Sequence, residues 1–88
     1  MGWRIEVSRT AEKQVSKLDP QTQLLVIRYL RERIEASTDP RRFGKALRDE
    51  KRGLWRYRVR DYRLICDIRD AEKVVVLLTV AHRKDVYR

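Results

Sequence analysis

Arginines alternate with apolar residues through positions 54–69, LWRYRVRDYRLICDIR. Arg56, Arg58 and Arg60 share one parity in the first half, and Arg63 joins their side in the second half. Successive side chains of a strand point to opposite faces of a sheet, so these arginines would gather on one surface of a two-stranded hairpin. Clustered guanidinium groups repel one another unless an anion lies among them, and their planar forks bind phosphate through paired hydrogen bonds. The stretch therefore predicts an anion-binding face that suits phosphate.

Two residues near the C-terminus could complete this face. Arg83 falls on it if the helix side of the last strand takes Val76, Leu78 and Val80. Tyr87 follows four residues later and could fold over the rim, where its ring would give an RNA base a stacking surface.

A structural role is the alternative for these residues. Arg63 and Arg83 would then pair with nearby aspartates, and Tyr87 would be a hydrophobic plug. The candidate partners are Asp61, Asp67 and Asp85. Ion pairs of this kind account more easily for a single arginine than for the whole set.

Other kinds of catalytic site lack their residues. One His and one Cys are too few for a zinc ligand set, and the C-terminal half has no serine for a Ser-His-Asp system. Three scattered glycines do not make a phosphate-binding loop. We expect no metal and no other cofactor.

Composition agrees with an anionic partner. The chain has 22 Lys and Arg against 13 Asp and Glu, a net charge of +9 in 88 residues, which favours a polyanion such as nucleic acid or an acidic protein segment. A basic surface that serves only solubility is the alternative. The length predicts one domain, residues 1–88. The longest apolar run is too short for a membrane span, no signal-peptide pattern is present, and the single Cys66 fits a reducing cytoplasm.

Two helices are predicted in the N-terminal half. The first begins after an N-cap at Ser8 or Thr10, and the second after an N-cap at Asp19 with Pro20 in its first turn. Both carry apolar residues at helical spacing: Ala11, Val15 and Leu18 in the first, and Leu24, Ile27, Leu30 and Ile34 in the second. The pair would form an antiparallel hairpin whose shared apolar face covers a sheet.

Strands are expected on both sides of the helix pair. Residues 3–7 alternate, and residues 74–81 are apolar on both faces, which is typical of an interior strand. The residues of the first strand placed toward the core are Trp3, Ile5 and Val7. Residues 41–53 form a basic connection, and the hairpin turns at Arg60 and Asp61, where an aspartate tolerates a left-handed backbone. The predicted fold is α+β in the order β-α-α-β-β-β, an antiparallel sheet with a helix hairpin on one face and a basic open face.

Three segments together resemble the RelE branch of the RelE/ParE toxin superfamily. They are GLWRYRV at 53–59, DYRL at 61–64 and AHRKDVY at 81–87. The resemblance covers essentially the whole chain and implies a RelE-like fold. It also implies a type II toxin that cuts messenger RNA in the ribosomal A site and is silenced by a cognate antitoxin in a toxin–antitoxin hetero-oligomer.

The resemblance also assigns roles to residues. Arg56 and Arg58 match basic residues of the second strand, and Arg63 matches the phosphate-binding arginine. Arg83 matches the proposed general acid, and Tyr87 matches the tyrosine that stacks on the substrate. The implied reaction is attack of a ribose 2′-OH on the adjacent phosphate, leaving a 2′,3′-cyclic phosphate and a 5′-OH.

This chain departs from the family pattern at the position of the general base. Where a lysine could lose its proton, Arg58 almost never can, so base catalysis is the open part of the mechanism. His82 titrates in the right range but has the parity of the opposite face if the strand continues that far. Arg48 follows a leucine as in many relatives, but Asp49 stands where a glycine is expected. The residues expected to bind RNA around the catalytic ones are Arg48, Arg56, Arg60 and His82.

Two other functions compete with RNA cleavage. The ParE branch shares the fold and is associated with DNA gyrase, but it generally lacks the set of Arg63, Arg83 and Tyr87. A non-catalytic module that binds RNA or a protein partner is the third possibility.

Overall fold

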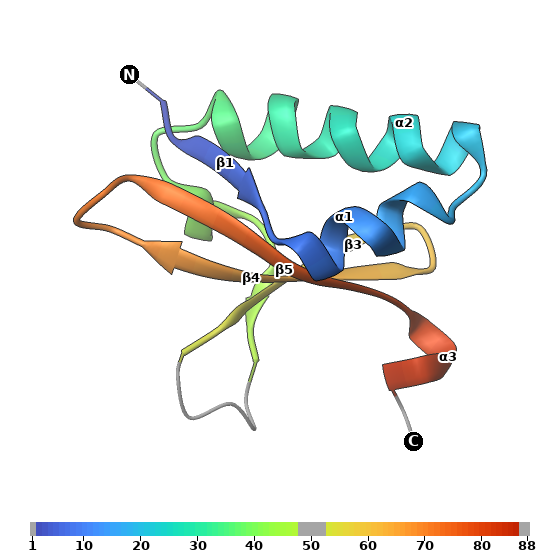
Figure 1. The fold of residues 1–88 in the computed structure, drawn as a ribbon. Helices are drawn as coiled ribbons and strands as arrows, with labels where there is room; N and C mark the ends of the chain where they lie inside the picture. Colours follow the sequence, from blue (N-terminus) through green and yellow to red (C-terminus); the bar gives the residue numbers. More distant parts are fainter. Residues whose placement is uncertain (1, 48–52, 87–88) are drawn as a thin grey trace.

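A five-stranded sheet with two helices on one face forms the protein (Figure 1). The computed structural model describes residues 2–47 and 53–86. The strands are ordered β1-β5-β4-β3-β2, and their bounds are β1 Arg4–Val7, β2 Lys45–Ala46, β3 Trp55–Val59, β4 Tyr62–Arg69 and β5 Val74–His82. All neighbouring strands run antiparallel except β1, which pairs with β5 in parallel. The predicted α+β architecture is confirmed, with this one parallel pair and the short strand β2 as additions.

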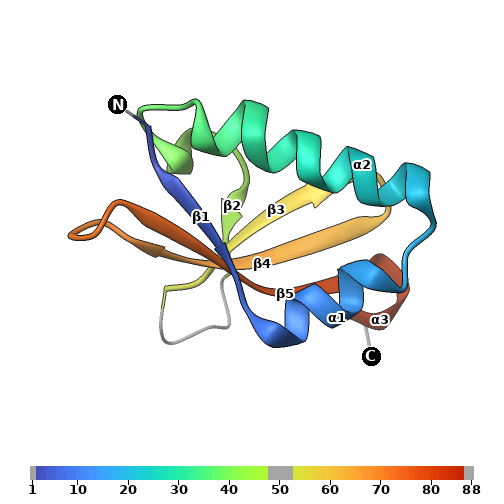
Figure 2. The same ribbon diagram turned by 45° about the horizontal axis from the view of Figure 1, so that its top comes forward.

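The helices begin where their caps predict. Ser8 is the N-cap of α1 (Arg9–Ser16) and accepts a hydrogen bond from the backbone N–H of Ala11 at 3.0 Å. Asp19 caps α2 (Pro20–Tyr29) in the same way, accepting from the N–H of Thr22 at 3.1 Å. Figure 2 shows that α1 lies along β5 while α2 crosses above the sheet.

The helix α2 continues into a π-helical segment, η1 (Leu30–Glu35), which changes the predicted apolar stripe. Leu30 and Ile34 are buried as expected, but Leu24 and Ile27 are 65% and 42% exposed. Val26 takes the inward position instead and is 1% exposed. In β1, Val7 is likewise exposed rather than in the core. Apolar side chains of α2 and of the end of β1 are therefore exposed to solvent, where the sequence had predicted them in the core.

One face of the β3–β4 hairpin forms the core under the helices, as the alternation predicts. Its buried residues include Tyr57, Leu64 and Cys66, each 0% exposed. The Tyr57 hydroxyl donates to the carbonyl of Pro40 at 2.7 Å, and burial raises the pKa of this phenol above its usual range. Pro40 begins η2 (Pro40–Arg42), a 3₁₀ turn that leads from the helices to β2. The opposite face of the hairpin is therefore directed away from the helices.

Strand β5 contains a β-bulge, which changes the side of the sheet to which its residues point. Ile65 pairs with Thr79 and Cys66 with Leu77, so Leu78 is an extra residue between two paired positions. Val75 and Leu77 face the helices before the bulge and Val80 faces them after it. The expectation that Val76 and Leu78 face the helices was wrong. Without the extra residue, the parity of Val75 and Leu77 would turn Thr79, Ala81 and Arg83 to the helix side.

Helix α1 holds this bulge from the edge of β5. The Ser8 hydroxyl donates to the carbonyl of Leu78 at 2.9 Å, and the side-chain oxygen of Gln14 accepts from the N–H of Val80 at 2.6 Å. These contacts satisfy the edge of β5 beyond the end of β1, where no strand pairs with it.

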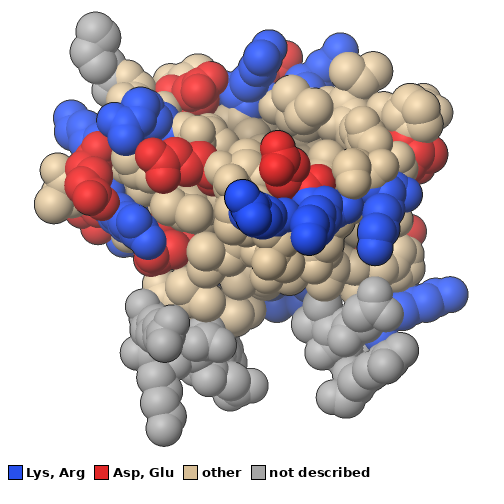
Figure 3. Space-filling model, in the orientation of Figure 1, with Lys and Arg blue, Asp and Glu red and all other residues tan. Residues whose placement is uncertain are grey.

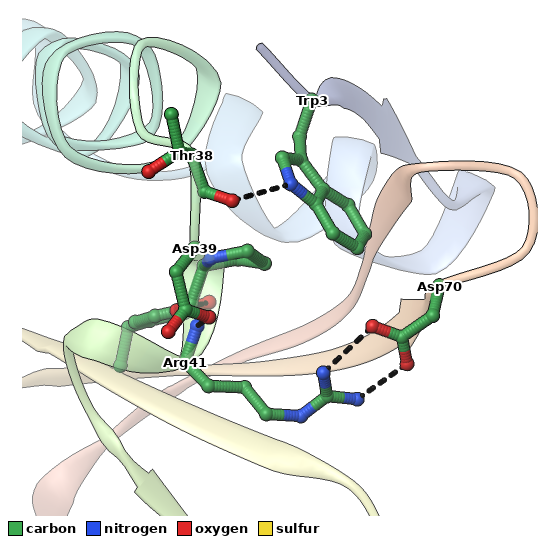
Figure 4. Close-up of polar contacts among 7 residues, drawn as sticks. Trp3, Thr38, Asp39, Arg41 and Asp70 are labelled. Atoms are coloured by element: carbon green, nitrogen blue, oxygen red, sulfur yellow. Dashed lines mark hydrogen bonds and ion pairs between the residues drawn. The ribbon is translucent and has the colours of Figure 1, made fainter.

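The far end of the sheet is closed by polar contacts between distant segments (Figure 4). The indole N–H of Trp3 donates to the carbonyl of Thr38 at 3.3 Å. Arg41 donates two hydrogen bonds, of 2.8 and 2.9 Å, to the carboxylate of Asp70 in the β4–β5 turn. No helix among the described residues is long and apolar enough to cross a membrane.

Candidate active site

Strand pairing brings the predicted arginines together on the open face. Arg58 of β3 lies directly opposite Arg63 of β4, and Ala81 of β5 lies opposite Arg63 on its other side. Directly opposite side chains have Cβ atoms about 5 Å apart. The small side chain of Ala81 leaves the space beside Arg63 open. Arg63 is 9% exposed, so it is held within the surface.

An open cavity of about 410 Å³ lies at these residues and is lined by Arg58, Arg63, Arg83 and Lys84. Three of the four predicted catalytic residues therefore border one space. Arg83 begins the short helix α3 (Arg83–Val86), which lies on the side of the sheet away from α1 and α2 (Figure 1). The bulge at Leu78 makes this possible, because it returns the end of β5 to the open-face parity.

The β3–β4 turn fixes two of these arginines. Asp61 accepts a 2.7 Å hydrogen bond from the backbone N–H of Arg83, and its carboxylate lies 3.9 Å from the guanidinium of Arg83. Both side chains of that pair are more than half exposed, so the pair contributes little energy. Arg60, and not Asp61, has the left-handed backbone, with φ of 54°. Its carbonyl accepts from Nε of Arg58 at 3.2 Å, which draws Arg58 toward the turn.

A second open cavity of about 230 Å³ adjoins the first and shares Arg58 and Arg63 with it. Its remaining lining residues are Gly44, Lys45 and Arg56. Arg56 was predicted as an RNA-binding residue, but Lys45 was not. It lies in β2, within a segment that the sequence presents as a basic connection without alternation. The only signal for it was a basic residue directly after a glycine.

The predicted residues His82 and Arg60 do not line either cavity. His82 pairs with Tyr62 across β4 and β5, and the two rings meet edge to face with centroids 5.1 Å apart. Because Tyr62 packs against the core, His82 lies on the helix side, as its parity indicated. Arg60 is exposed at the turn. Arg48 and Tyr87 lie outside the described residues.

The chemistry available to the two cavities is that of fixed positive charge. None of the described residues that line them is acidic. Cys66 is buried on the other face, and burial raises the pKa of its thiol to about 12, which keeps it protonated and unreactive. In the described part of the chain no three His, Cys, Asp or Glu side chains form a group that could hold a metal ion. The arrangement can bind a phosphodiester and stabilise negative charge that develops on it.

Comparison with known proteins identifies the family. Residues 5–87 match the model of the family described as ParE toxin of type II toxin-antitoxin system, parDE. Toxin RelG of Mycobacterium tuberculosis is 35% identical over 88 residues, which are 100% of this chain and 99% of the relative. The chain belongs to the RelE/ParE superfamily of type II toxins.

Solved structures support the RelE branch of that superfamily. The toxin–antitoxin complex RelBE2 of M. tuberculosis matches with a TM-score of 0.81 and 32% identity, over 94% of this chain and 100% of that one. The RelE–RelB complex of Pyrococcus horikoshii shares the fold, with a TM-score of 0.76 and 24% identity over 94% and 97% of the two chains. The predicted RelE-like fold is confirmed.

Proposed function

We propose that this toxin is a ribosome-dependent endoribonuclease that cuts messenger RNA in the A site. The observation that carries the proposal is the cavity of about 410 Å³ in which Arg58, Arg63 and Arg83 meet, with no acidic residue among its described lining residues. The RelE-branch relationship supports RNA rather than another polyanion as the substrate.

The reaction proposed for this site is transesterification within the RNA. The 2′-oxygen of one ribose forms a bond to the adjacent phosphorus while the bond from phosphorus to the 5′-oxygen of the next nucleotide breaks. The proton of the 2′-OH leaves to a base or to water, and the departing 5′-oxygen gains a proton. The products are a 2′,3′-cyclic phosphate and a 5′-OH.

Each arginine has a part in this reaction. Arg58 and Arg63 lie opposite each other and would hold the non-bridging oxygens, on which charge increases in the pentacoordinate transition state. Arg83 would donate a proton to the strongly basic 5′-alkoxide. Because a guanidinium hardly ever loses its proton, Arg58 is not suited to accept one from the 2′-OH. Charge stabilisation and orientation of the RNA by the ribosome would then carry most of the rate enhancement.

The remaining predicted residues belong to the substrate-binding surface in this proposal. Tyr87 would stack on or orient the nucleotide, and Arg48, Arg56 and Arg60 would contact the RNA backbone. Because the ring of His82 packs against Tyr62, His82 would act at the rim of the site rather than as a base in the cavity.

A cognate antitoxin is the proposed protein partner. The related structures of M. tuberculosis and P. horikoshii are toxin–antitoxin complexes. Val7 at the end of β1 and Leu24 and Ile27 of α2 are exposed, and Val7 and Ile27 line an open groove of about 330 Å³ that residues of α1 and α2 also border. An amphipathic antitoxin segment would cover this groove. Expression without the antitoxin should arrest growth, and normal growth at high expression would speak against the proposal.

The test of the function is to map the 5′ ends of cellular messenger RNA during expression of the wild type and of Arg83→Ala. We expect new ends within coding regions in the wild type and their loss in the variant. Arg69→Ala, which removes an arginine of β4 that pairs with Asp67 at 3.1 Å, is the matched control and should cut like the wild type. Growth arrest with intact messenger RNA would reject RNA cleavage, and gyrase-linked DNA damage in those cells would favour the ParE-type activity instead.

A further inference from the structure

The smaller cavity adds two basic residues, Lys45 and Arg56, that do not line the larger one. It is lined by Lys45 and Arg56 on β2 and β3, and it opens beside Arg58 and Arg63. We propose that it is a second phosphate subsite, in which Lys45 and Arg56 bind the RNA phosphate next to the one that is cut. The inference rests on the proposed function only for which phosphate is the scissile one.

Sheet geometry supports two successive phosphates. Lys45 lies opposite Arg56, and β2, β3 and β4 are consecutive in the sheet. Neighbouring strands lie about 4.8 Å apart, so the basic side chains of β2 and β4 are separated by about 10 Å across the strands. An RNA backbone that crosses the strands would leave one phosphate over β4 and bring the adjacent phosphate toward β2. Both cavities share Arg58 and Arg63, so the two spaces adjoin at these basic side chains.

Lys45 is held in place by the glycine before it. Gly44 has φ of +76°, and a Cβ at this position would overlap the carbonyl oxygen of Arg56. The indole N–H of Trp55 donates to the carbonyl of Phe43 at 2.6 Å, which ties the same segment to β3. The segment that carries Lys45 is thus packed directly on β3, and this packing does not involve the side chain of Lys45.

Lys45 and Arg56, the two basic residues that only the smaller cavity contains, hold no carboxylate partner among the described residues. None of the described ion pairs involves Lys45 or Arg56, whereas Arg41 and Arg69 at the other end of the sheet each have a carboxylate partner. An ammonium group beside guanidinium groups raises the free energy of the empty protein, and an anion between them removes that repulsion. A phosphodiester is the anion that a neighbouring phosphate site would deliver.

The experiment compares two short RNAs that differ by one phosphate. A 2′-O-methyl dinucleoside with one phosphate and a 2′-O-methyl trinucleotide with two cannot be cut, so affinity is measured without cleavage. Lys45→Ala should weaken binding of the trinucleotide about 5- to 10-fold and leave the dinucleoside within about 2-fold, with a reduction of about 0.7 in the slope of log affinity against log salt for the trinucleotide. Lys45→Arg should preserve both affinities.

Lys13→Ala is the matched control, because it removes the same charge from the exposed surface of α1 and lines neither cavity. Equal weakening of both RNAs by Lys45→Ala, or no weakening of either, would overturn the subsite. The proposed function fails separately: a protein that shows the length-dependent effect of Lys45 but never cuts ribosome-bound RNA would keep the subsite and lose the endoribonuclease activity.

Discussion

Arginines at the two ends of the sheet have opposite surroundings. At the β4–β5 end, Arg41 is bound to Asp70 through two hydrogen bonds and Arg69 donates to Asp67. At the β3–β4 end, Arg58 and Arg63 face each other, and the carboxylate of Asp61 lies 3.9 Å from the guanidinium of Arg83. On the side of the molecule drawn in Figure 3, acidic and basic side chains are also intermixed.

The difference separates arginines that join segments through ion pairs from arginines that line an open cavity. The contact of Arg41 with Asp70 links the 3₁₀ turn to a loop 29 residues away, so its charge is already neutralised in the fold. The arginines of the cavity bring like charges close together, and an anion bound among them lowers their repulsion. We therefore expect substitutions at the two ends to affect different properties, stability at one end and RNA chemistry at the other.

Replacing the most central arginine should have the largest effect. Arg63→Ala should lower the rate of RNA cleavage by about 100- to 1,000-fold, because it removes a donor aimed at charge that develops in the transition state. Arg69→Ala on the same strand should cleave within about 2-fold of the wild type, a difference that mutational scatter allows. Single-turnover cleavage of ribosome-bound messenger RNA measures both, and thermal unfolding checks that Arg63→Ala is folded. Equal rates in the two variants would erase the distinction between the ends.

Gly44→Ala should separate the wall of the smaller cavity from β3. The added Cβ would meet the carbonyl of Arg56 and would require a left-handed backbone, together costing about 2 kcal/mol or more of unfolding free energy. Gly53→Ala is the control, because its φ is also positive, at 71°, but a Cβ there meets nothing within 4 Å. Denaturant unfolding should rank Gly44→Ala as clearly less stable than Gly53→Ala. The reverse order would mean that β2 is not packed as described.

Arg60→Asn should increase the free energy of unfolding and weaken RNA binding. Asparagine accepts the left-handed conformation that Arg60 adopts, so the variant should gain up to about 1 kcal/mol of unfolding free energy. Loss of one peripheral charge should weaken RNA binding about 2- to 3-fold and reduce its salt dependence. Denaturant midpoints and RNA titrations measure the two effects, and a less stable variant with unchanged affinity would contradict both expectations.

The ion pair at the far end should give a small, pH-dependent effect. The side-chain hydrogen bonds from Arg41 hold the pKa of Asp70 below its ordinary value of 3.8. Since the folded state binds the proton less readily than the unfolded state, this stabilisation is present above about pH 4 and is lost as the pH falls below it. The unfolding midpoint of Asp70→Asn should therefore lie slightly below that of the wild type at pH 7 and converge with it near pH 3. A constant difference across this range would show that the pair does not act through the carboxylate.

Much of the fold follows from local sequence rules, and the exceptions have physical causes. Alternation predicted the β3–β4 hairpin and its arginine face, and the Ser8 and Asp19 caps predicted both helix starts. The bulge at Leu78 was not predictable, because residues 74–81 are apolar on both faces and carry no parity signal. The predicted burial of Leu24 and Ile27 was wrong, because the helix becomes π-helical after Tyr29 and the apolar stripe was predicted with a single α-helical period.

Local sequence rules also predicted only part of the candidate site. Sequence reasoning grouped Arg58, Arg63 and Arg83, and strand register places them around one cavity, although the parity expected for the middle of β5 was wrong. Lys45 was missed because a strand of two residues is too short to show alternation. Its position depends on Gly44 packing against β3, which is a tertiary contact without a sequence pattern of its own.

The measurement that tests the central claim most directly uses purified protein and ribosomes carrying a defined messenger RNA with an empty A site. The wild type should cut within the A-site codon and leave a 2′,3′-cyclic phosphate, which resists phosphatase until acid opens it, while Arg63→Ala should leave the RNA intact on the same time scale. Intact RNA with the wild type, or equal cutting by both proteins, would contradict the assignment of the arginine face as an RNA-cleaving site.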